Sequence, residues 1–390
     1  MFSYKDTMDK LIKNEVDSGN VVGANALVIH KGNEIYHNTF GYADKENKIP
    51  MKRDTIFRMY SMTKPITAVA TMILVERGEI DLWDPISKYI PEFLNQEVYT
   101  SDGKLTPVKR EVNIQDLLNM TSGIPYPDES NESGRQMEKL FTKFIERREK
   151  GDSPDTMEYI KAIGKVPLVF QPGEKWMYGL SADILGGIIE IVSGKKYGQF
   201  LKEELFDPLD MKDTGFFVPK DKLNRFAKNY SWNEEKEELS VFNISHLGEY
   251  YGEDVAFESG GAGLVSTIDD YSHFAMMMVN KGEYNGKRIL GRKTIEFMAQ
   301  DRLASDQKDN YKGDGVRGYG YGFLMRILID QKEAATNASL GEFGWDGWTG
   351  NYVIMDPKEN VVFMYFIQRC GSGVTPIVRK LRMATYAALE

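Results

Sequence analysis

Ser61 and Lys64 are the pair of residues in this chain whose types and spacing are best suited to nucleophilic chemistry. Residues three apart share a face of a helix, so the Lys64 amine can reach the Ser61 hydroxyl. Burial would lower the lysine pKa from its ordinary value of about 10.4, which suits a group that takes and returns a proton. The pattern predicts an activated serine; the plainer alternative is a serine that only caps a helix.

The Ser-x-x-Lys spacing alone does not select Ser61, because it occurs four times in the sequence. Only Ser61 precedes a long apolar segment, PITAVATMILVER, which predicts a buried helix over residues 65–77. The other three pairs lie in a polar turn, at a predicted helix end and in a polar loop: Ser101–Lys104, Ser193–Lys196 and Ser305–Lys308. The surrounding sequence therefore favours Ser61.

Tyr178 is a second candidate, because it lies between a Pro172-Gly173 turn and a helix predicted to be capped by Ser181. A tyrosine whose pKa is lowered beside a lysine can act as a general base where histidine is absent. The alternative is a tyrosine at the edge of the core whose hydroxyl is simply hydrogen-bonded.

A third element is the segment FGWDGWTG, residues 343–350, which leads into a predicted strand. Glycines beside a strand edge let a substrate lie close to the main chain, and an exposed N–H there can complete an oxyanion hole. A tight hairpin with structural tryptophans is the alternative.

Composition narrows the classes of function. The chain has 390 residues with a net charge of −9, which argues against nucleic acid as a main partner. A single cysteine excludes an internal disulfide and a cysteine-based zinc site. The N-terminus shows no apolar signal-peptide region, and no apolar run reaches the length of about 18 residues that a membrane span needs. We therefore expect a cytoplasmic protein with no membrane span.

The elements that would position the candidate residues are predicted at both ends of the chain. They are a helix over 1–16, a hairpin over 23–30 and 33–40, strands over 319–328, 351–356 and 360–368, and a helix over 375–389. The middle of the chain, 81–260, is predicted to be mostly helical, and its charged segment 129–155 to be a solvated excursion. This order predicts an α/β domain interrupted by a helical insertion.

Taken together, the three elements resemble the serine β-lactamase and penicillin-binding-protein superfamily, most of all class C β-lactamases and family VIII carboxylesterases. The resemblance covers most of the chain, including GANALVIHKGNEIYHNTFGYAD, SMTK, ILVERGEIDLWDPISKYIP, LLNMTSGI, QPGEKWMYGLSADILGGIIE, SGGAGLVSTIDDYSHFA and GWDGWTGNYVIMDPKENVVFMYFIQ. It implies an α/β (α+β) fold, with an antiparallel sheet formed by both termini and flanked by helices. We expect a sheet domain at 1–80 and 265–390, a mainly helical insertion at 81–264, and the active site between them.

The resemblance also implies roles for individual positions. Ser61 would be the acylated nucleophile, Lys64 its proton partner and Tyr178 the tyrosine of the Tyr-x-Asn element; which of the last two is the base stays open. Trp345-Asp346-Gly347 would stand at the Lys-Thr-Gly element, and the amides of Ser61 and Trp348 would form the oxyanion hole. The remaining candidates for such chemistry are then dispensable for turnover: His30, His37, His246, His273 and Cys370.

Two departures from the family pattern bear on the substrate. Leu180 replaces the asparagine of Tyr-x-Asn, which would hold a substrate acylamino group. Trp345 replaces the lysine of Lys-Thr-Gly, which could pair with a β-lactam carboxylate. Both losses should weaken lactam turnover, while Trp345, Trp348 and Tyr126 would form an apolar, aromatic acyl pocket.

The sequence thus predicts a serine hydrolase without metal or cofactor, mainly a carboxylesterase on short-chain acyl esters, with weak or no β-lactamase activity. The predicted partner is a small-molecule ester or amide, and the oligomeric state is left open. A β-lactamase, a D-amino-acid peptidase and an acyltransferase are alternatives within the superfamily. A catalytically silent ligand-binding homologue is the alternative outside the enzymes.

Overall fold

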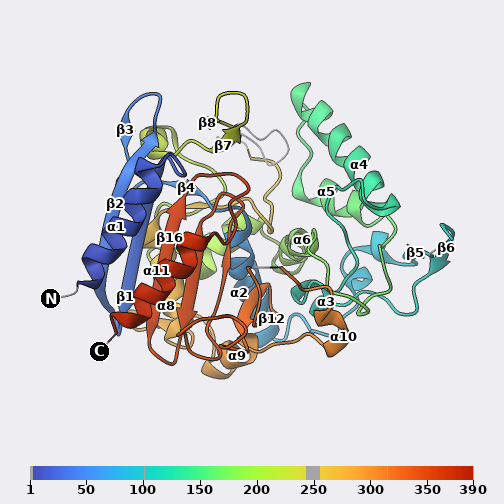
Figure 1. Cartoon of the computed structure of the whole chain (residues 1–390). Coiled ribbons are helices and arrows are strands. Elements are labelled where there is room, and N and C mark those ends of the chain that lie inside the picture. The colour runs from blue at the N-terminus through green and yellow to red at the C-terminus, as the bar shows by residue number, and fades with distance from the viewer. Residues whose placement is uncertain (1–2, 101, 243–254, 314, 390) are drawn as a thin grey trace.

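A single antiparallel sheet forms the centre of the protein (Figure 1). The structure is a computed structural model that describes residues 3–100, 102–242, 255–313 and 315–389. The sheet has eight strands in the order β12-β13-β14-β15-β16-β1-β2-β3, so strands from the two ends of the chain lie side by side. Their bounds are β1 Gly23–His30, β2 Asn33–Asp44, β3 Ile49–Pro50, β12 Tyr319–Gly322, β13 Met325–Leu328, β14 Phe343–Asp346, β15 Tyr352–Asp356 and β16 Val361–Ile367.

Strand β16 joins the two ends of the chain, because it pairs with β15 on one side and with β1 on the other. All seven of its residues are buried. A strand covered on both faces must be apolar at every position rather than at alternate ones, and VVFMYFI satisfies this requirement. The predicted fold, an antiparallel sheet formed by both termini and flanked by helices, is confirmed.

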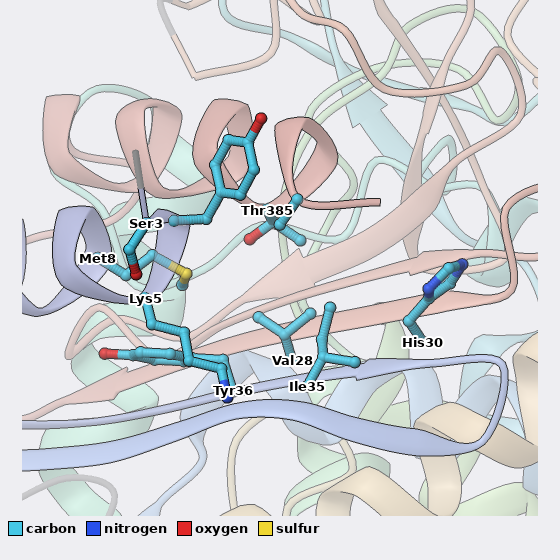
Figure 2. Close-up of a pocket in the computed structure, with 10 residues that line it drawn as sticks. Ser3, Lys5, Met8, Val28, His30, Ile35, Tyr36 and Thr385 are labelled. Carbon is cyan, nitrogen blue, oxygen red and sulfur yellow. The ribbon is translucent and has the colours of Figure 1, made fainter. Parts of the chain in front are cut away.

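Helices cover both faces of the sheet. Helices α1 (Tyr4–Asp17) and α11 (Pro376–Ala387) pack against each other on the near face in Figure 1, and α8 (Ile268–Val279) lies against the opposite face. A groove of about 490 Å³ remains between α1, the β1–β2 hairpin and α11, lined in part by Met8, Val28 and Thr385 (Figure 2). None of the predicted site residues lines this groove.

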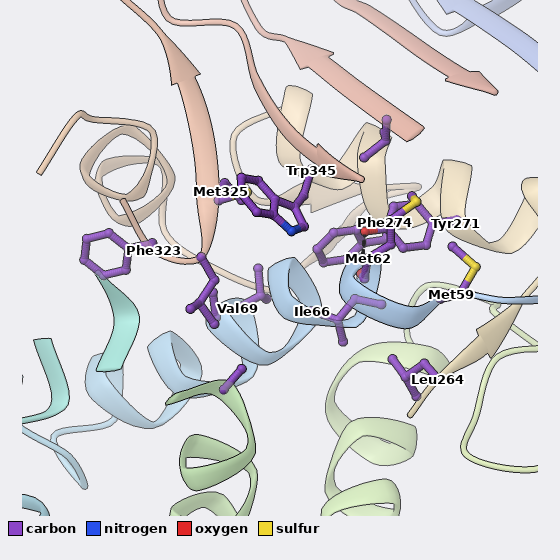
Figure 3. Packing of buried hydrophobic residues seen from close by; sticks show 14 of the residues in the cluster. Met59, Met62, Ile66, Val69, Leu264, Tyr271, Phe274, Phe323, Met325 and Trp345 are labelled. Atoms are coloured by element: carbon purple, nitrogen blue, oxygen red, sulfur yellow. Dashed lines mark hydrogen bonds between the residues drawn. The ribbon is translucent and has the colours of Figure 1, made fainter. Parts of the chain in front are cut away.

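Helix α2 (Thr63–Glu76) is buried from Thr63 to Leu74, as its apolar sequence predicts. It lies between the sheet and the helices of the middle region, where it packs against α6 (Ser181–Ser193). Figure 3 shows side chains of this segment among residues from α8 and from the sheet: Met59, Met62, Ile66, Val69, Tyr271, Phe274, Met325 and Trp345. Ser61 and Lys64 are therefore placed at the start of the most enclosed helix.

The middle of the chain adds helices and two small hairpins. The helices are α3 Ile114–Leu118, α4 Glu132–Glu149, α5 Thr156–Ile163, α6 and α7 Tyr197–Leu201, and the strand pairs are β5 Glu97–Tyr99 with β6 Leu105–Pro107 and β7 Tyr230–Asn233 with β8 Glu238–Val241. Elsewhere lie β4 Phe57–Arg58, β9 Val265–Ser266, β10 Glu283–Tyr284, β11 Lys287–Arg288, α9 Arg292–Met298 and α10 Ser305–Lys308.

The division into a sheet domain and an insertion domain stays a prediction. Within the described residues, no helix is long and apolar enough to cross a membrane.

Two local predictions were wrong. The segment 129–155 is not a solvated excursion, because α4 buries Met137, Phe141 and Phe144 along one side. These apolar residues recur at helical spacing among many charged ones. The high charge of the whole segment therefore did not indicate that one side of the helix is buried. Ser181 does not cap α6 either: Leu180 holds the cap position, and the buried Ser181 hydroxyl is hydrogen-bonded to that of Ser122 at 2.8 Å.

A buried ion pair anchors α11 to the sheet and yields a prediction about stability. Glu342, next to β14, is 0% exposed and accepts a hydrogen bond from Arg382 of α11, which is 4% exposed. Removing one partner of such a pair leaves a buried charge uncompensated, at a cost of about 3–5 kcal/mol. We expect Arg382→Met to lower the free energy of unfolding by that amount, measured by urea denaturation.

The double variant Arg382→Met/Glu342→Leu serves as the control, because it removes both charges together. It should recover most of the lost stability. An Arg382→Met protein as stable as the wild type would contradict the assignment.

Candidate active site

Ser61 lies in a 3-10 turn, Tyr60–Met62, that continues directly into α2. Tyr60 has φ 45°, in the left-handed region that side chains other than glycine rarely adopt. The Tyr60 hydroxyl accepts a hydrogen bond from Asn229 Nδ2 at 2.7 Å, and the Met59 amide donates to the Leu264 carbonyl at 2.8 Å. Contacts with distant parts of the chain thus hold the strained turn that presents Ser61.

Lys64 lies in the first turn of α2 and is 0% exposed. Its Nζ is 3.2 Å from Ser61 Oγ, 3.0 Å from the Tyr126 hydroxyl and 2.8 Å from the Gly261 carbonyl oxygen. These three neutral partners match the three hydrogens of an ammonium group. The predicted pairing of Ser61 with Lys64 is therefore present as a direct contact.

Burial shifts the pKa values of the two candidate bases in opposite directions. It lowers the pKa of Lys64 to about 8, while the negative charges of Asp183 and Asp346 act to raise it. Burial raises the pKa of Tyr178 above its ordinary value, although hydrogen bonds with Ser61 and Trp345 act to lower it. The expectation of a tyrosine with a lowered pKa is wrong, because desolvation disfavours the phenolate. Near neutral pH, Lys64 is the group that can lose its proton.

Tyr178 is held by aromatic neighbours. Its hydroxyl accepts a hydrogen bond from Trp345 Nε1 at 3.0 Å, and its ring centre lies 4.6 Å from Lys64 Nζ. The rings of Tyr126 and Trp345 pack on it at centroid distances of 5.6 and 5.7 Å. Trp345, which stands where the family pattern has a lysine, therefore orients Tyr178.

The turn between β14 and β15 is tied to the segment that precedes Ser61. The Gly347 amide donates to the Asn351 carbonyl at 2.7 Å, and Asn351 Nδ2 donates to the Arg58 carbonyl at 2.9 Å. Gly350 donates to Gly347 at 2.9 Å, which closes the turn. Among the described residues, the Trp348 amide has no main-chain acceptor, so it can bind a ligand.

A pocket of about 470 Å³ opens beside Ser61 and Tyr178. Its other lining residues are mostly apolar or aromatic: Tyr60, Tyr126, Pro127, Phe141, Ile145, Leu180, Phe257, Ala262 and Trp348. Two carboxylates, Glu138 and Asp183, also line it, whereas no lysine, arginine or histidine does so among the described residues. The acidic side chains of the described lining are therefore not matched by basic ones.

The predicted substrate residues fall into two groups. Leu180, Tyr126 and Trp348 line the pocket, whereas Trp345, Asp346 and Gly347 are not part of its lining. Asp346 instead accepts a hydrogen bond at 2.9 Å from Arg326, a side chain only 1% exposed. The structure thus places Asp346 in an internal ion pair beneath the site.

Four residues of the site were not predicted from the sequence: Asp183, Gly261, Arg326 and Asn351. Gly261 contacts Lys64 through its carbonyl oxygen, and Asn351 acts through an amide in the turn, so neither belongs to a residue type that indicates catalysis. The available sequence feature was SGG at 259–261, because adjacent glycines mark a close approach of the main chain.

The other chemical candidates that fall within the described residues lie apart from this cluster. Ser193 ends α6 and donates to the Ile189 carbonyl, Ser305 is exposed on α10, and Ser101 and His246 lie outside the described residues. Burial raises the pKa of the Cys370 thiol to about 12, which disfavours the nucleophilic thiolate. His30 lies on β1, His37 on β2 and His273 on α8. That His30, His37, His246, His273 and Cys370 are dispensable for turnover stays a prediction.

The chain is similar to known proteins in sequence and in fold. Residues 8–388 match the model of the family described as Beta-lactamase. The chain is similar to Protein Rv1367c of Mycobacterium tuberculosis, with 31% identity over 92% of this chain and 88% of the relative, and to Esterase EstB of Burkholderia gladioli, with 29% identity over 97% and 94%. It is also similar to the solved structure of EstCE1, a hydrolase with promiscuous acyltransferase activity, with a TM-score of 0.83 and 26% identity over 98% of each chain.

The close approach of Gly347 to the Ser61 segment yields a prediction. A Cβ at Gly347 would lie 2.5 Å from the Met59 carbonyl oxygen, so Gly347→Ala must push the Trp348 turn away from Ser61. We expect the rate of Ser61 labelling by a fluorophosphonate to fall about 10²-fold or more, the cost of losing one oxyanion-hole donor.

Gly215→Ala is the matched control, because a Cβ there meets no atom within 4 Å. It should label at the wild-type rate. Wild-type labelling of a folded Gly347→Ala protein would show that the turn does not assist Ser61.

Proposed function

The chain belongs to the β-lactamase family and is a serine hydrolase, and we propose that it acts as a carboxylesterase on short-chain acyl esters through an acyl-enzyme on Ser61. The observation that carries this proposal is the contact of the buried Lys64 amine with Ser61 Oγ beside an apolar pocket. The similarity to Esterase EstB and to EstCE1 supports ester hydrolysis.

Acylation begins with a proton transfer from Ser61 to Lys64. A neutral amine has two hydrogens and one lone pair. The Gly261 carbonyl can only accept a hydrogen bond, so it takes one hydrogen, and Tyr126 can take the other. The lone pair is then left for the Ser61 hydroxyl proton. Ser61 Oγ attacks the ester carbonyl, and the amides of Ser61 and Trp348 stabilise the negative oxygen that forms.

In the proposed mechanism, Tyr178 carries the proton onward. As a neutral phenol it can donate to the departing alkoxide oxygen and regain a proton from the Lys64 ammonium, so that the alcohol leaves protonated. In the second half of the reaction the neutral Lys64 amine takes a proton from water, directly or through Tyr178. The hydroxide that forms attacks the acyl carbon, the bond from that carbon to Ser61 Oγ breaks, and Oγ takes the proton from the Lys64 ammonium.

The surroundings of Ser61 favour neutral esters over β-lactams. Leu180 lines the pocket with an apolar side chain where the asparagine of the family pattern would bind an acylamino group. The indole N–H of Trp345 donates to the Tyr178 hydroxyl and is therefore not available to a substrate. With two carboxylates and no cation in the described lining, a substrate carboxylate would be repelled. This charge distribution also disfavours peptides that end in a free carboxylate.

Acyl transfer is a second candidate, supported by the similarity to EstCE1, a hydrolase with promiscuous acyltransferase activity. An apolar pocket can hold an alcohol that competes with water for the same acyl-enzyme. Chromatographic detection of the new ester, formed from an added alcohol in preference to the free acid, would favour this candidate.

Substitution of Ser61 tests the proposed function. We expect wild-type protein to hydrolyse p-nitrophenyl butyrate faster than p-nitrophenyl palmitate and to turn over a chromogenic cephalosporin poorly. Ser61→Ala should lower kcat on the butyrate by about 10³-fold or more, since the acyl-enzyme can no longer form. Ser305→Ala, in the exposed Ser-x-x-Lys pair of α10, should leave the rate unchanged.

Two outcomes would contradict the proposal. Undiminished ester hydrolysis by Ser61→Ala would exclude Ser61 as the nucleophile. Efficient cephalosporin turnover together with negligible ester hydrolysis would exclude the esterase.

The pKa of Lys64 predicts how activity depends on pH. Below about pH 8 the amine is protonated and cannot accept the Ser61 proton, so kcat/KM should rise as pH increases and level off above that value. Initial rates on p-nitrophenyl butyrate, corrected for uncatalysed hydrolysis and for protein stability, measure the profile. A rate that is flat across this range would show that Lys64 is not the titrating base.

A further inference from the structure

A buried carboxylate, Asp183, is connected to Lys64 by an unbroken chain of hydrogen bonds. Asp183 lies in the first turn of α6 and is 2% exposed. Its Oδ1 accepts from Ser259 Oγ at 2.5 Å, and Ser259 Oγ accepts from the Ala262 amide at 3.0 Å. The carbonyl of that same peptide group belongs to Gly261 and accepts from Lys64 Nζ at 2.8 Å. One hydroxyl and one peptide group thus separate the carboxylate from the amine.

The main chain that carries this connection is fixed on both sides. The Gly261 amide also donates to Asp183 Oδ1, at 3.2 Å, and the Thr67 hydroxyl of α2 donates to the Gly260 carbonyl at 2.6 Å. A Cβ at Gly260 would lie 2.3 Å from the Ala182 carbonyl oxygen, so this approach to α6 requires glycine. The acceptor of the Lys64 hydrogen bond is therefore held at a fixed position.

Asp183 is also the carboxylate whose charge acts most directly on Lys64. Among the described residues, the titratable groups that face the amine are Tyr126, Tyr178, Asp183 and Asp346. Burial raises the pKa values of both tyrosines, which keeps them neutral. The charge of Asp346 is compensated by Arg326, whereas the hydrogen bonds that Asp183 accepts come from neutral groups.

Hydrogen bonds in series strengthen one another in a buried site. Burial raises the pKa of Asp183, whereas the hydrogen bonds from Ser259 and Gly261 and the charge of Lys64 act to lower it. In its ionised form, Asp183 polarises the Ser259 hydroxyl and the Ala262 amide, which places more negative charge on the Gly261 carbonyl oxygen. That oxygen then holds the Lys64 amine more firmly and stabilises its positive charge after proton transfer.

We propose that Asp183, acting through Ser259 and the Gly261–Ala262 peptide, is a positioning residue that holds the Lys64 amine against Ser61 and sets the pH range in which Ser61 reacts. The inference rests on the proposed function, in which Lys64 takes the Ser61 proton. In that step the Ser61 O–H bond breaks, its proton bonds to Lys64 Nζ, and the freed electron pair of Oγ forms the bond to the acyl carbon. The ammonium later gives the proton to the leaving group.

The test measures the rate at which a fluorophosphonate labels Ser61 as a function of pH, because this rate does not depend on the identity of the substrate. Asp183→Asn keeps the shape but removes the charge. We expect the midpoint of the pH profile to move by about one unit to lower pH, because the Lys64 ammonium loses a favourable charge. The labelling rate on the alkaline plateau should fall about tenfold, equivalent to about 1.4 kcal/mol.

A second variant separates the connection from the charge. Ser259→Ala keeps the Asp183 carboxylate but interrupts the series of hydrogen bonds to Lys64, so the plateau should fall while the midpoint moves less than in Asp183→Asn.

Asp270→Asn is the matched control. Asp270 is a buried carboxylate in the first turn of α8 that accepts from the Asp213 amide at 2.6 Å, and its substitution should leave the profile unchanged.

Thermal unfolding verifies that each variant is folded. A folded Asp183→Asn protein with the wild-type midpoint and plateau would overturn the inference, as would an equal effect of Asp270→Asn. Should Asp183→Asn fail to fold, a wild-type plateau in Ser259→Ala would overturn it instead. Absence of Ser61 labelling in the wild type at every pH would overturn the proposed function itself, which is a different result.

Discussion

The burial of one lysine amine is the constraint on which the rest of this structure depends. Lys64 has no exposed surface, and the three groups that contact its Nζ are neutral, so the cost of removing a charge from water is not offset by a direct ion pair. This cost outweighs the favourable charges of Asp183 and Asp346, so it lowers the pKa of Lys64. Keeping water away requires enclosure from every side, and α2 is accordingly enclosed by the sheet, α8 and α6.

This enclosure explains why the site is assembled from distant parts of the chain. Ser61, the proposed nucleophile, comes from the first hundred residues. The carbonyl that accepts from Lys64 comes from the loop before β9, and the Trp348 turn comes from the C-terminal strands. Asn351 and the Trp345–Tyr178 hydrogen bond join these parts directly. A shift of the β14–β15 turn relative to α2 would therefore displace Trp348 and Tyr178 together.

The sequence was most informative where the spacing of reactive residues and the pattern of the residues around them support the same interpretation. Ser61 and Lys64 could be identified because a specific spacing precedes an apolar helix, and most strands of the eight-stranded sheet could be predicted from apolar runs, whereas β14 and the short strands outside that sheet could not. Sequence alone could not give the order of the strands, since pairing is set by the whole fold. It could not give the direction of the Tyr178 pKa either, because that depends on burial among Tyr126 and Trp345. The apolar side of α4 was missed because charged residues outnumber the buried ones.

In the proposed mechanism, helix α4 affects which substrates fit the pocket but takes no part in proton transfer at Ser61. It contributes Phe141 and Ile145 to the pocket but makes no hydrogen bond to Ser61, Lys64 or Tyr178 among the contacts described. Substitutions on its inner side can therefore change the molecules that fit without altering proton transfer. In evolutionary terms, a lineage built on this scaffold can acquire new substrates by drift in one surface helix while its reaction chemistry remains under constant selection.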